Sequence, residues 1–274
     1  MLVYATNQPR KTPSDDDLLT VMTYNIRFAA DDPEHLWSER FPLVLNVIER
    51  NRPDVLGVQE PLHEQMRDLA DGLGEYDSIG EGRDGGTAGE YSAIFFRRRR
   101  LEVREHGAFW LSDTPEIPGS ITWGNSLPRM VTWGAFHDRA TGGDFVMFNT
   151  HFDYDPTNHG ARVRLKSARL LERRAAGAMD PVIVTGDFND AAGTAPAYEH
   201  LTTAGFADTW HEAERVGPLV TTFHDYGTAD SDIRIDWILR KGQVRTATAT
   251  IDHGEGARRA SDHFPVVARV QIEN

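Results

Sequence analysis

Residues 18–60, LLTVMTYNIRFAADDPEHLWSERFPLVLNVIERNRPDVLGVQE, carry the pattern that decides the fold. The run from Leu18 to Tyr24 is apolar and rich in β-branched residues, which predicts a buried strand. An apolar stripe at helical spacing predicts a helix from about Glu39 to Asn51, with Ser38 as its N-cap. Val55 to Val58 is a second predicted strand. This strand–helix–strand order favours a parallel pair joined by a crossover, and therefore an α/β fold.

Polar residues follow both of these strands. Asn25 comes directly after the first strand, and Glu60 comes shortly after the second. Parallel neighbours end at the same edge of a sheet, and ligands of open α/β sheets bind in the crevice outside that edge. The inferred fold, rather than the residue spacing itself, therefore predicts that Asn25 and Glu60 lie close together.

The remainder of the chain is rich in predicted strands. Residues 138–143 (DRATGG) predict a hairpin turn. No linker, repeat or change in composition divides the chain, so we expect one α/β domain with two mixed sheets. The tail at residues 1–17 is expected to be flexible. Further strands are predicted at residues 92–96, 104–111, 129–137, 145–150, 181–185, 233–239, 244–251 and 264–272, and a second helix at 160–178.

Composition excludes several classes of function. The net charge of −13, from 42 acidic and 29 basic residues, argues against a dedicated nucleic-acid binder, which needs a broad basic surface. The chain has no cysteine, which excludes disulfides, thiolate metal sites and cysteine nucleophiles. No signal peptide or membrane span is visible in the sequence. We therefore expect a cytoplasmic monomer.

Polar residues recur where the predicted strands end. An aspartate, asparagine or histidine at a strand end is commonly a turn former, so each one alone indicates little. Their recurrence at several strand ends indicates a shared site. Besides Asn25 and Glu60, the residues concerned are His151, Asp153, Asp187, Asn189, Asp236, Asp262 and His263.

Asp236 is the residue in this set that most needs a partner. It lies within the apolar stretch 235–239 (IDWIL), where a buried charge requires compensation. His263 is a suitable partner, and the alternative is an aspartate that caps a nearby loop.

Six short motifs occur in order along the chain: residues 23–27 (TYNIR), 59–60 (QE), 149–153 (NTHFD), 186–189 (GDFN), 234–238 (RIDWI) and 261–265 (SDHFP). Together they resemble the endonuclease/exonuclease/phosphatase family, which includes deoxyribonuclease I-like nucleases, sphingomyelinases, inositol polyphosphate phosphatases and deadenylases. The resemblance runs from about Leu18 to the C-terminus. It implies a domain at residues 18–274 that is a four-layer α/β sandwich, with two mixed β-sheets packed face to face and helices on the outside.

The resemblance also implies a divalent metal. Glu60 matches the main ligand of Mg²⁺ or Mn²⁺ in the family, and Asn25 and Asp262 match positions that assist metal binding. Hard oxygen ligands suit Mg²⁺. Asp187 would orient and deprotonate the attacking water, and Asn189 would bond to that water or to a phosphoryl oxygen.

The histidines complete the implied catalytic set. His263, held by Asp236, would donate to the phosphoryl group, and His151 would support the leaving-group side. The alternative for His151 is a strand-end histidine that bonds only to backbone. Further candidates for substrate binding are Tyr91, Arg129 and Arg162.

The leading hypothesis is a metal-dependent phosphoesterase that acts on a mono- or diester of a small or lipid-derived molecule. The alternatives are a nuclease or deadenylase-like phosphodiesterase and an inactive binding module of the same fold. Arg27 stands where apurinic-site endonucleases of the family carry an acidic residue, and residues 149–151 (NTH) replace their tyrosine–proline motif, which argues against DNA repair.

Residues 80–85 match GxGxxG without a following helix, so they are interpreted as a loop. The arginines at 97–100 are interpreted as a solvated hairpin end. Trp123, in a long loop, is a candidate substrate contact.

Overall fold

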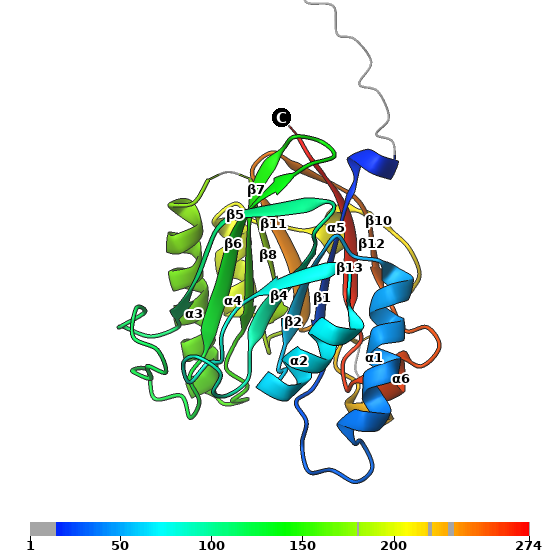
Figure 1. Ribbon diagram of the computed structural model, residues 1–274. Coiled ribbons are helices and arrows are strands. Elements are labelled where there is room, and N and C mark those ends of the chain that lie inside the picture. Colours follow the sequence, from blue (N-terminus) through cyan, green and yellow to red (C-terminus); the bar gives the residue numbers. More distant parts are fainter. Residues whose placement is uncertain (1–14, 180, 219–220, 230–232, 274) are drawn as a thin grey trace, which may run out of the picture.

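The computed structural model describes residues 15–179, 181–218, 221–229 and 233–273 (Figure 1). Most of the tail predicted at residues 1–17 lies outside the described residues. Its last three residues, Asp15–Asp17, form a single 3-10 turn that precedes the first strand.

The first sheet is built around the predicted parallel pair. β1 (Leu19–Asn25) and β2 (Val55–Gln59) are parallel neighbours, with Asn25 opposite Gln59. All side chains of β2 are buried, as its apolar sequence predicts. The sheet has seven strands in the order β10 (Glu214–Arg215), β12 (Val244–Ile251), β13 (Val266–Ile272), β1, β2, β4 (Ser92–Arg97) and β3 (Tyr76–Ile79).

The second sheet is also mixed, which confirms the predicted sheet class. β7 and β8 are parallel, and β11 is antiparallel to β8. The sheet has six strands in the order β5 (Leu101–Trp110), β6 (Met130–Asp138), β7 (Asp144–His151), β8 (Val182–Asp187), β11 (Asp236–Lys241) and β9 (Ala207–Asp208).

Helices cover the two outer faces, which confirms the α/β sandwich (Figure 1). α1 (Trp37–Asn51), α2 (His63–Gly72) and α6 (Ala257–Ala260) lie against the first sheet, and α3 (Asn158–Ala176) and α4 (Pro196–Thr203) against the second. The short α5 (Thr209–Glu212) lies beside β11 and β12. No helix of the described residues is long and apolar enough to cross a bilayer.

The predicted start of α1 was wrong by two residues. The helix begins at Trp37 after the N-cap Leu36, whose carbonyl oxygen accepts from the Arg40 amide at 3.1 Å. Ser38 therefore lies inside the first turn and makes no cap. Arg52 ends the helix in the left-handed conformation.

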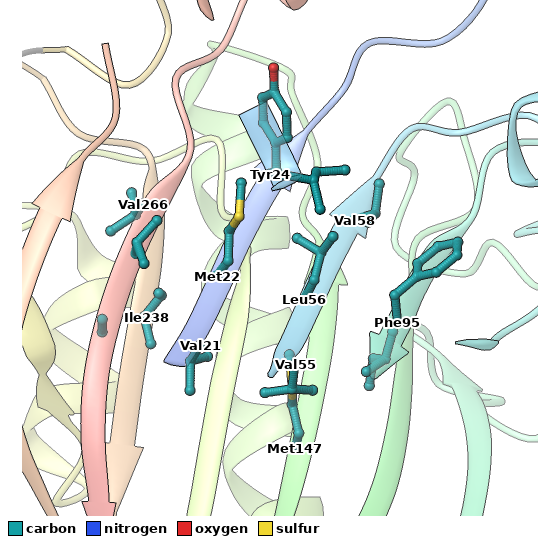
Figure 2. Close-up of a cluster of buried hydrophobic side chains, with 14 of the residues drawn as sticks. Val21, Met22, Tyr24, Val55, Leu56, Val58, Phe95, Met147, Ile238 and Val266 are labelled. Atoms are coloured by element: carbon teal, nitrogen blue, oxygen red, sulfur yellow. The ribbon is translucent and has the colours of Figure 1, made fainter. Parts of the chain in front are cut away.

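Apolar side chains of both sheets meet in one buried cluster. Met22 and Leu56 of the first sheet lie in the same cluster as Met147 and Ile238 of the second (Figure 2). Their burial joins the sheets face to face, because removing this apolar surface from water stabilises the packed state.

A polar bridge crosses the interface between the sheets. The Asn149 side chain on β7 donates to the carbonyl oxygens of Val58 and Ala93 and accepts from the Gln59 amide at 2.7 Å. Gly57 makes this close approach possible, because a Cβ there would overlap Asn149 and Thr185. The bridge fixes how the carboxyl ends of β2 and β7 lie relative to each other.

The predicted hairpin at residues 138–143 is confirmed. The Asp138 amide donates to the Gly143 carbonyl at 2.8 Å, and the Gly142 amide donates to the Asp138 carbonyl at 2.7 Å. The buried Asp138 carboxylate accepts two hydrogen bonds from Arg100, from Nε at 2.7 Å and from Nη2 at 2.9 Å. The arginine run at residues 97–100 joins β4 of the first sheet to β5 of the second, so its interpretation as a solvated hairpin end was wrong. Arg100 in this run is ion-paired with Asp138.

We expect Asp138→Asn to lower the free energy of unfolding by about 1–3 kcal/mol at pH 7, because it removes a charge-assisted pair with Arg100. Burial alone would raise the pKa of Asp138, but the hydrogen bonds from Arg100 and the loop lower it. This stabilisation is fully present above the unfolded-state pKa of about 4 and is lost as the pH falls through the lower folded pKa. Urea unfolding of both proteins at pH 7 and pH 3 tests this.

The control for this prediction is Asp144→Asn, an exposed aspartate of the same hairpin. Its effect should stay below about 0.5 kcal/mol at either pH. An equal loss in both variants, or a loss in Asp138→Asn that does not shrink at low pH, would contradict the assignment.

Candidate active site

The polar residues predicted at the strand ends converge at one edge of the sandwich. In the second sheet, His151 pairs with Asp187 across β7 and β8, and Asp236 pairs with Asp187 across β8 and β11. In the first sheet, Asn25 ends β1 and Glu60 follows β2. The predicted convergence of Asn25 and Glu60 is confirmed by a hydrogen bond of 2.8 Å between their side chains.

Asp187 lies at the centre of these polar residues, which we call the active-site cluster. Its Oδ2 accepts from the Asn25 amide at 3.0 Å and lies 3.5 Å from His151 Nε2 and 3.7 Å from His263 Nε2. Its Oδ1 accepts from the Asn189 backbone at 2.9 Å. Burial, and next the charge of Asp236, raise the pKa of Asp187 to about 7. An aspartate with so high a pKa is a stronger base than an exposed one.

The predicted pair of Asp236 and His263 is present. His263 Nδ1 lies 2.9 Å from Asp236 Oδ2, and both side chains are buried. Burial disfavours the charged ring, but the carboxylates of Asp236 and Asp187 raise the pKa of His263 well above its usual value. The ring is therefore a cation that can donate from Nε2 toward the side of Asp187.

His151 has the opposite electrostatic setting. Burial, and next the charges of Arg129 and Arg83, lower its pKa well below the usual value, so the ring is neutral. Its Nε2 lies 2.9 Å from the amide nitrogen of Asn189, which donates, so Nε2 accepts. The alternative in which His151 bonds only to backbone is therefore wrong. The two histidines beside Asp187 differ in charge, and they can perform different tasks.

The donor set of the cluster fits a hard divalent cation. Ligand atoms of Glu60, His151 and Asp187 lie within 4.8 Å of one another, and so do those of Asp187, Asp236 and His263. Asp236 Oδ1 is buried without a hydrogen-bond partner among the residues that the structure describes. Carboxylates outnumber the cationic groups here, and carboxylate oxygen is the ligand that Mg²⁺ and Mn²⁺ prefer.

Two predicted metal ligands have other contacts. Asn25 donates from its amide nitrogen to Glu60 and Asp187, and its oxygen accepts from the Arg27 amide at 2.9 Å. In this arrangement Asn25 positions the two carboxylates. Asp262 lies 3.9 Å from Arg27 Nε and 3.2 Å from Ser261 Oγ, so its role as a ligand stays a prediction.

The predicted substrate-binding residues separate into two groups. Tyr91 and Arg129 line a small cavity together with His151. Arg162, in contrast, is exposed on α3, and no described hydrogen bond or ion pair connects it to the cluster. Side chains advance by 100° per residue along a helix. Arg164, two residues further, therefore points inward, where it lies 3.3 Å from Asp190. The structure does not support the prediction for Arg162.

Trp123 also differs from its prediction. It is largely buried in the apolar cluster under α3, and its indole nitrogen donates to Asp113 at 2.8 Å. It is a packing residue, because its loop folds back onto the second sheet.

Sequence reasoning missed an ion pair beside the cavity. Arg83 makes a bidentate pair with Glu90, at 2.6 and 2.8 Å. Burial, and next the charge of Glu60, raise the pKa of Glu90 to about 7. Arg83 belongs to the GxGxxG segment, which forms a loop without a helix, as interpreted. The only signal was the placement of two opposite charges on either side of a glycine-rich loop.

Strained backbone surrounds the cluster. Three of its non-glycine residues have positive φ: Arg27 at 54°, Glu60 at 72° and Asn189 at 49°. Such conformations cost free energy and concentrate at functional sites, where the surrounding structure holds them.

Comparison with known proteins identifies the family of this chain. The model of the endonuclease/exonuclease/phosphatase family matches residues 22–263. The chain belongs to this family. Members of the endonuclease/exonuclease/phosphatase family are hydrolases of phosphoester bonds, and the matched range spans the cluster from Asn25 to His263.

Solved structures agree with the family assignment. A family protein from Bacteroides vulgatus is 36% identical, with a TM-score of 0.87 over 93% of this chain and 99% of that one. The mannosyl-6-phosphatase of Bacteroides thetaiotaomicron is 32% identical, with a TM-score of 0.83 over 92% and 99%. The catalytic domain of human Nocturnin, at 19% identity and a TM-score of 0.71 over 93% and 94%, shares the fold alone.

One curated relative is more distant. The uncharacterized protein L388 of Acanthamoeba polyphaga mimivirus is 28% identical over 161 residues, which are 56% of this chain. The match spans 59% of the length of that protein, so it adds no assignment of activity.

Proposed function

We propose that this chain is a Mg²⁺- or Mn²⁺-dependent phosphoesterase that hydrolyses a phosphate ester of a small or lipid-derived molecule by attack of water at phosphorus. One observation carries the proposal. A basic, buried Asp187 lies within 4 Å of a neutral His151 and a charged His263, at the carboxylate-rich edge of the sandwich.

Each residue has a task that follows from its geometry. A cation held by Glu60, with Asp262 as a further predicted ligand, would neutralise the charge of the phosphate and polarise its P–O bonds. Asp187 would accept the proton of the attacking water. His263 would donate a hydrogen bond to a phosphoryl oxygen, where negative charge develops. Asn189, held by His151, would orient the water.

The size of the substrate is inferred from charge and similarity. The net charge of −13 disfavours a long polyanion such as nucleic acid. The similar structure from Bacteroides thetaiotaomicron is named for a small sugar phosphate. Both observations favour a small phosphorylated substrate over an oligonucleotide.

We expect hydrolysis of phenyl phosphate or bis(4-nitrophenyl) phosphate with Mg²⁺ or Mn²⁺, and loss of that activity in EDTA. Phosphate or nitrophenol release measures it, with an oligonucleotide assayed in parallel. Activity that survives EDTA would refute metal dependence. Hydrolysis of the oligonucleotide alone would favour a nuclease, and failure on every ester would favour a binding module.

A further inference from the structure

Arg27 lies beside the active-site cluster, and part of its side chain is open to solvent. Its backbone amide donates to Asn25 Oδ1 at 2.9 Å, and the amide of the next residue, Phe28, donates to Glu60 Oε2 at 3.1 Å. Its Nε lies 3.9 Å from Asp262 Oδ2, which is too long for a hydrogen bond. The side chain of Arg27 is 21% exposed. A solute can therefore reach this side chain between Glu60 and Asp262.

The backbone at Arg27 is held without the guanidinium group. Its carbonyl oxygen accepts from Gln65 Nε2 at 3.0 Å and from Arg40 Nη2 at 3.1 Å. Arg40 is buried, and its guanidinium donates only to backbone carbonyl oxygens. These contacts maintain the positive φ of Arg27, 54°, a conformation that costs free energy. The Arg27 guanidinium is therefore not needed to shape the loop.

Two neighbours fix the direction of the Arg27 guanidinium. Its Nη2 donates to Asp32 Oδ2 at 3.0 Å, and its Cζ lies 5.0 Å from the centre of the Tyr226 ring. Asp32 is itself held by His35, whose Nδ1 lies 2.9 Å from the same oxygen. A guanidinium has more N–H donors than Asp32 accepts, so donors remain for an anion. Because the side chain is already held, binding an anion orders it little further.

We propose that Arg27 is a further substrate-binding residue, whose guanidinium binds a terminal phosphoryl oxygen of the substrate. The proposal rests on the proposed function and narrows its substrate class. A phosphate monoester has three terminal oxygens, and in a diester an ester group replaces one of them. The cation and His263 would contact two of these oxygens. The third position offers Arg27 a charged acceptor in a monoester but an ester group in a diester, so Arg27 selects the monoester.

Two esters with the same leaving group test this selectivity. We expect Arg27→Met to lower kcat/KM for 4-nitrophenyl phosphate by about 10- to 100-fold, because a charge-assisted hydrogen bond to the dianion is lost. Bis(4-nitrophenyl) phosphate, a diester, should change by less than about threefold, the effect of removing one exposed charge. The matched control is Arg67→Met, an exposed arginine of α2, which should leave the ratio of the two esters unchanged.

Thermal unfolding separates binding from structure. Because Gln65 and Arg40 hold the backbone at residue 27, Arg27→Met should fold and should lower Tm by less than about 4 °C. An equal loss of kcat/KM on both esters would overturn the proposal. So would an unfolded Arg27→Met protein alongside a folded Arg67→Met protein, because the guanidinium would then be structural.

Anion binding keeps the role of Arg27 separate from catalysis. Calorimetric titration of the Mg²⁺-loaded protein measures its affinity for inorganic phosphate and for dimethyl phosphate, a diester. Arg27→Met should bind inorganic phosphate about 10-fold or more weakly than the wild-type protein, without a comparable difference for dimethyl phosphate. Ester hydrolysis without this difference would remove the role of Arg27 and leave the proposed function intact. Phosphate binding that depends on Arg27, without hydrolysis of any ester, would refute the proposed function and leave Arg27 as a phosphate-binding residue.

Discussion

Asp187→Ala is expected to lower kcat for phosphoester hydrolysis by about 10²–10⁴-fold, the usual contribution of a general base. Asp187 is held by Asn25 and the Asn189 backbone, and burial raises its pKa to about 7. Among the described residues, Asp187 is the carboxylate that lies within 4 Å of both His151 and His263, so no other carboxylate can replace it as the base. Steady-state kinetics at saturating metal measure the effect.

Asp187→Asn provides the matched comparison. It keeps the shape of the side chain but removes the base, so its loss in kcat should be similar to that of the alanine variant. Circular dichroism should show that both variants fold. Unchanged hydrolysis in both proteins would contradict the role of Asp187 even though the fold is right.

His263→Ala is expected to lower kcat by about 10²–10³-fold, because it removes a charged donor from the side where negative charge develops. Asp236→Asn should lower kcat as well, since the charge of Asp236 raises the pKa of His263. It should also destabilise the fold by about 3–5 kcal/mol, because it leaves a buried imidazolium without its partner.

A double-mutant cycle tests this pairing. If Asp236 acts through His263, the double variant Asp236→Asn/His263→Ala should lose little more kcat than His263→Ala alone. Independent, additive losses would show that Asp236 acts elsewhere. Urea unfolding of the four proteins gives the matching coupling in stability.

The sequence predicted those parts of the site that depend on strand ends. β1, β2, β7 and β8 have apolar, β-branched runs, so their positions and the polar residues after them could be identified. The short α2 and α4 were missed, because ten and eight residues carry too weak a periodic signal.

Side-chain direction was the harder problem. Arg162 and Arg164 look alike in sequence, and only the rotation of α3 shows that the second one faces inward. Asn25 was predicted to assist metal binding. Its amide nitrogen faces Glu60 and Asp187, and its role as a ligand stays a prediction.

The metal-dependent centre is tested by Mn²⁺ titration monitored through the histidine ring signals in NMR, with assignments from His151→Gln and His263→Gln. Mn²⁺ broadens signals of nearby protons. If Glu60 holds the ion, the signals of His151 and His263 should broaden first, and Glu60→Gln should shift this broadening to higher Mn²⁺ concentration. Broadening of other histidines while these two stay sharp would contradict a metal-dependent centre at this edge of the sandwich.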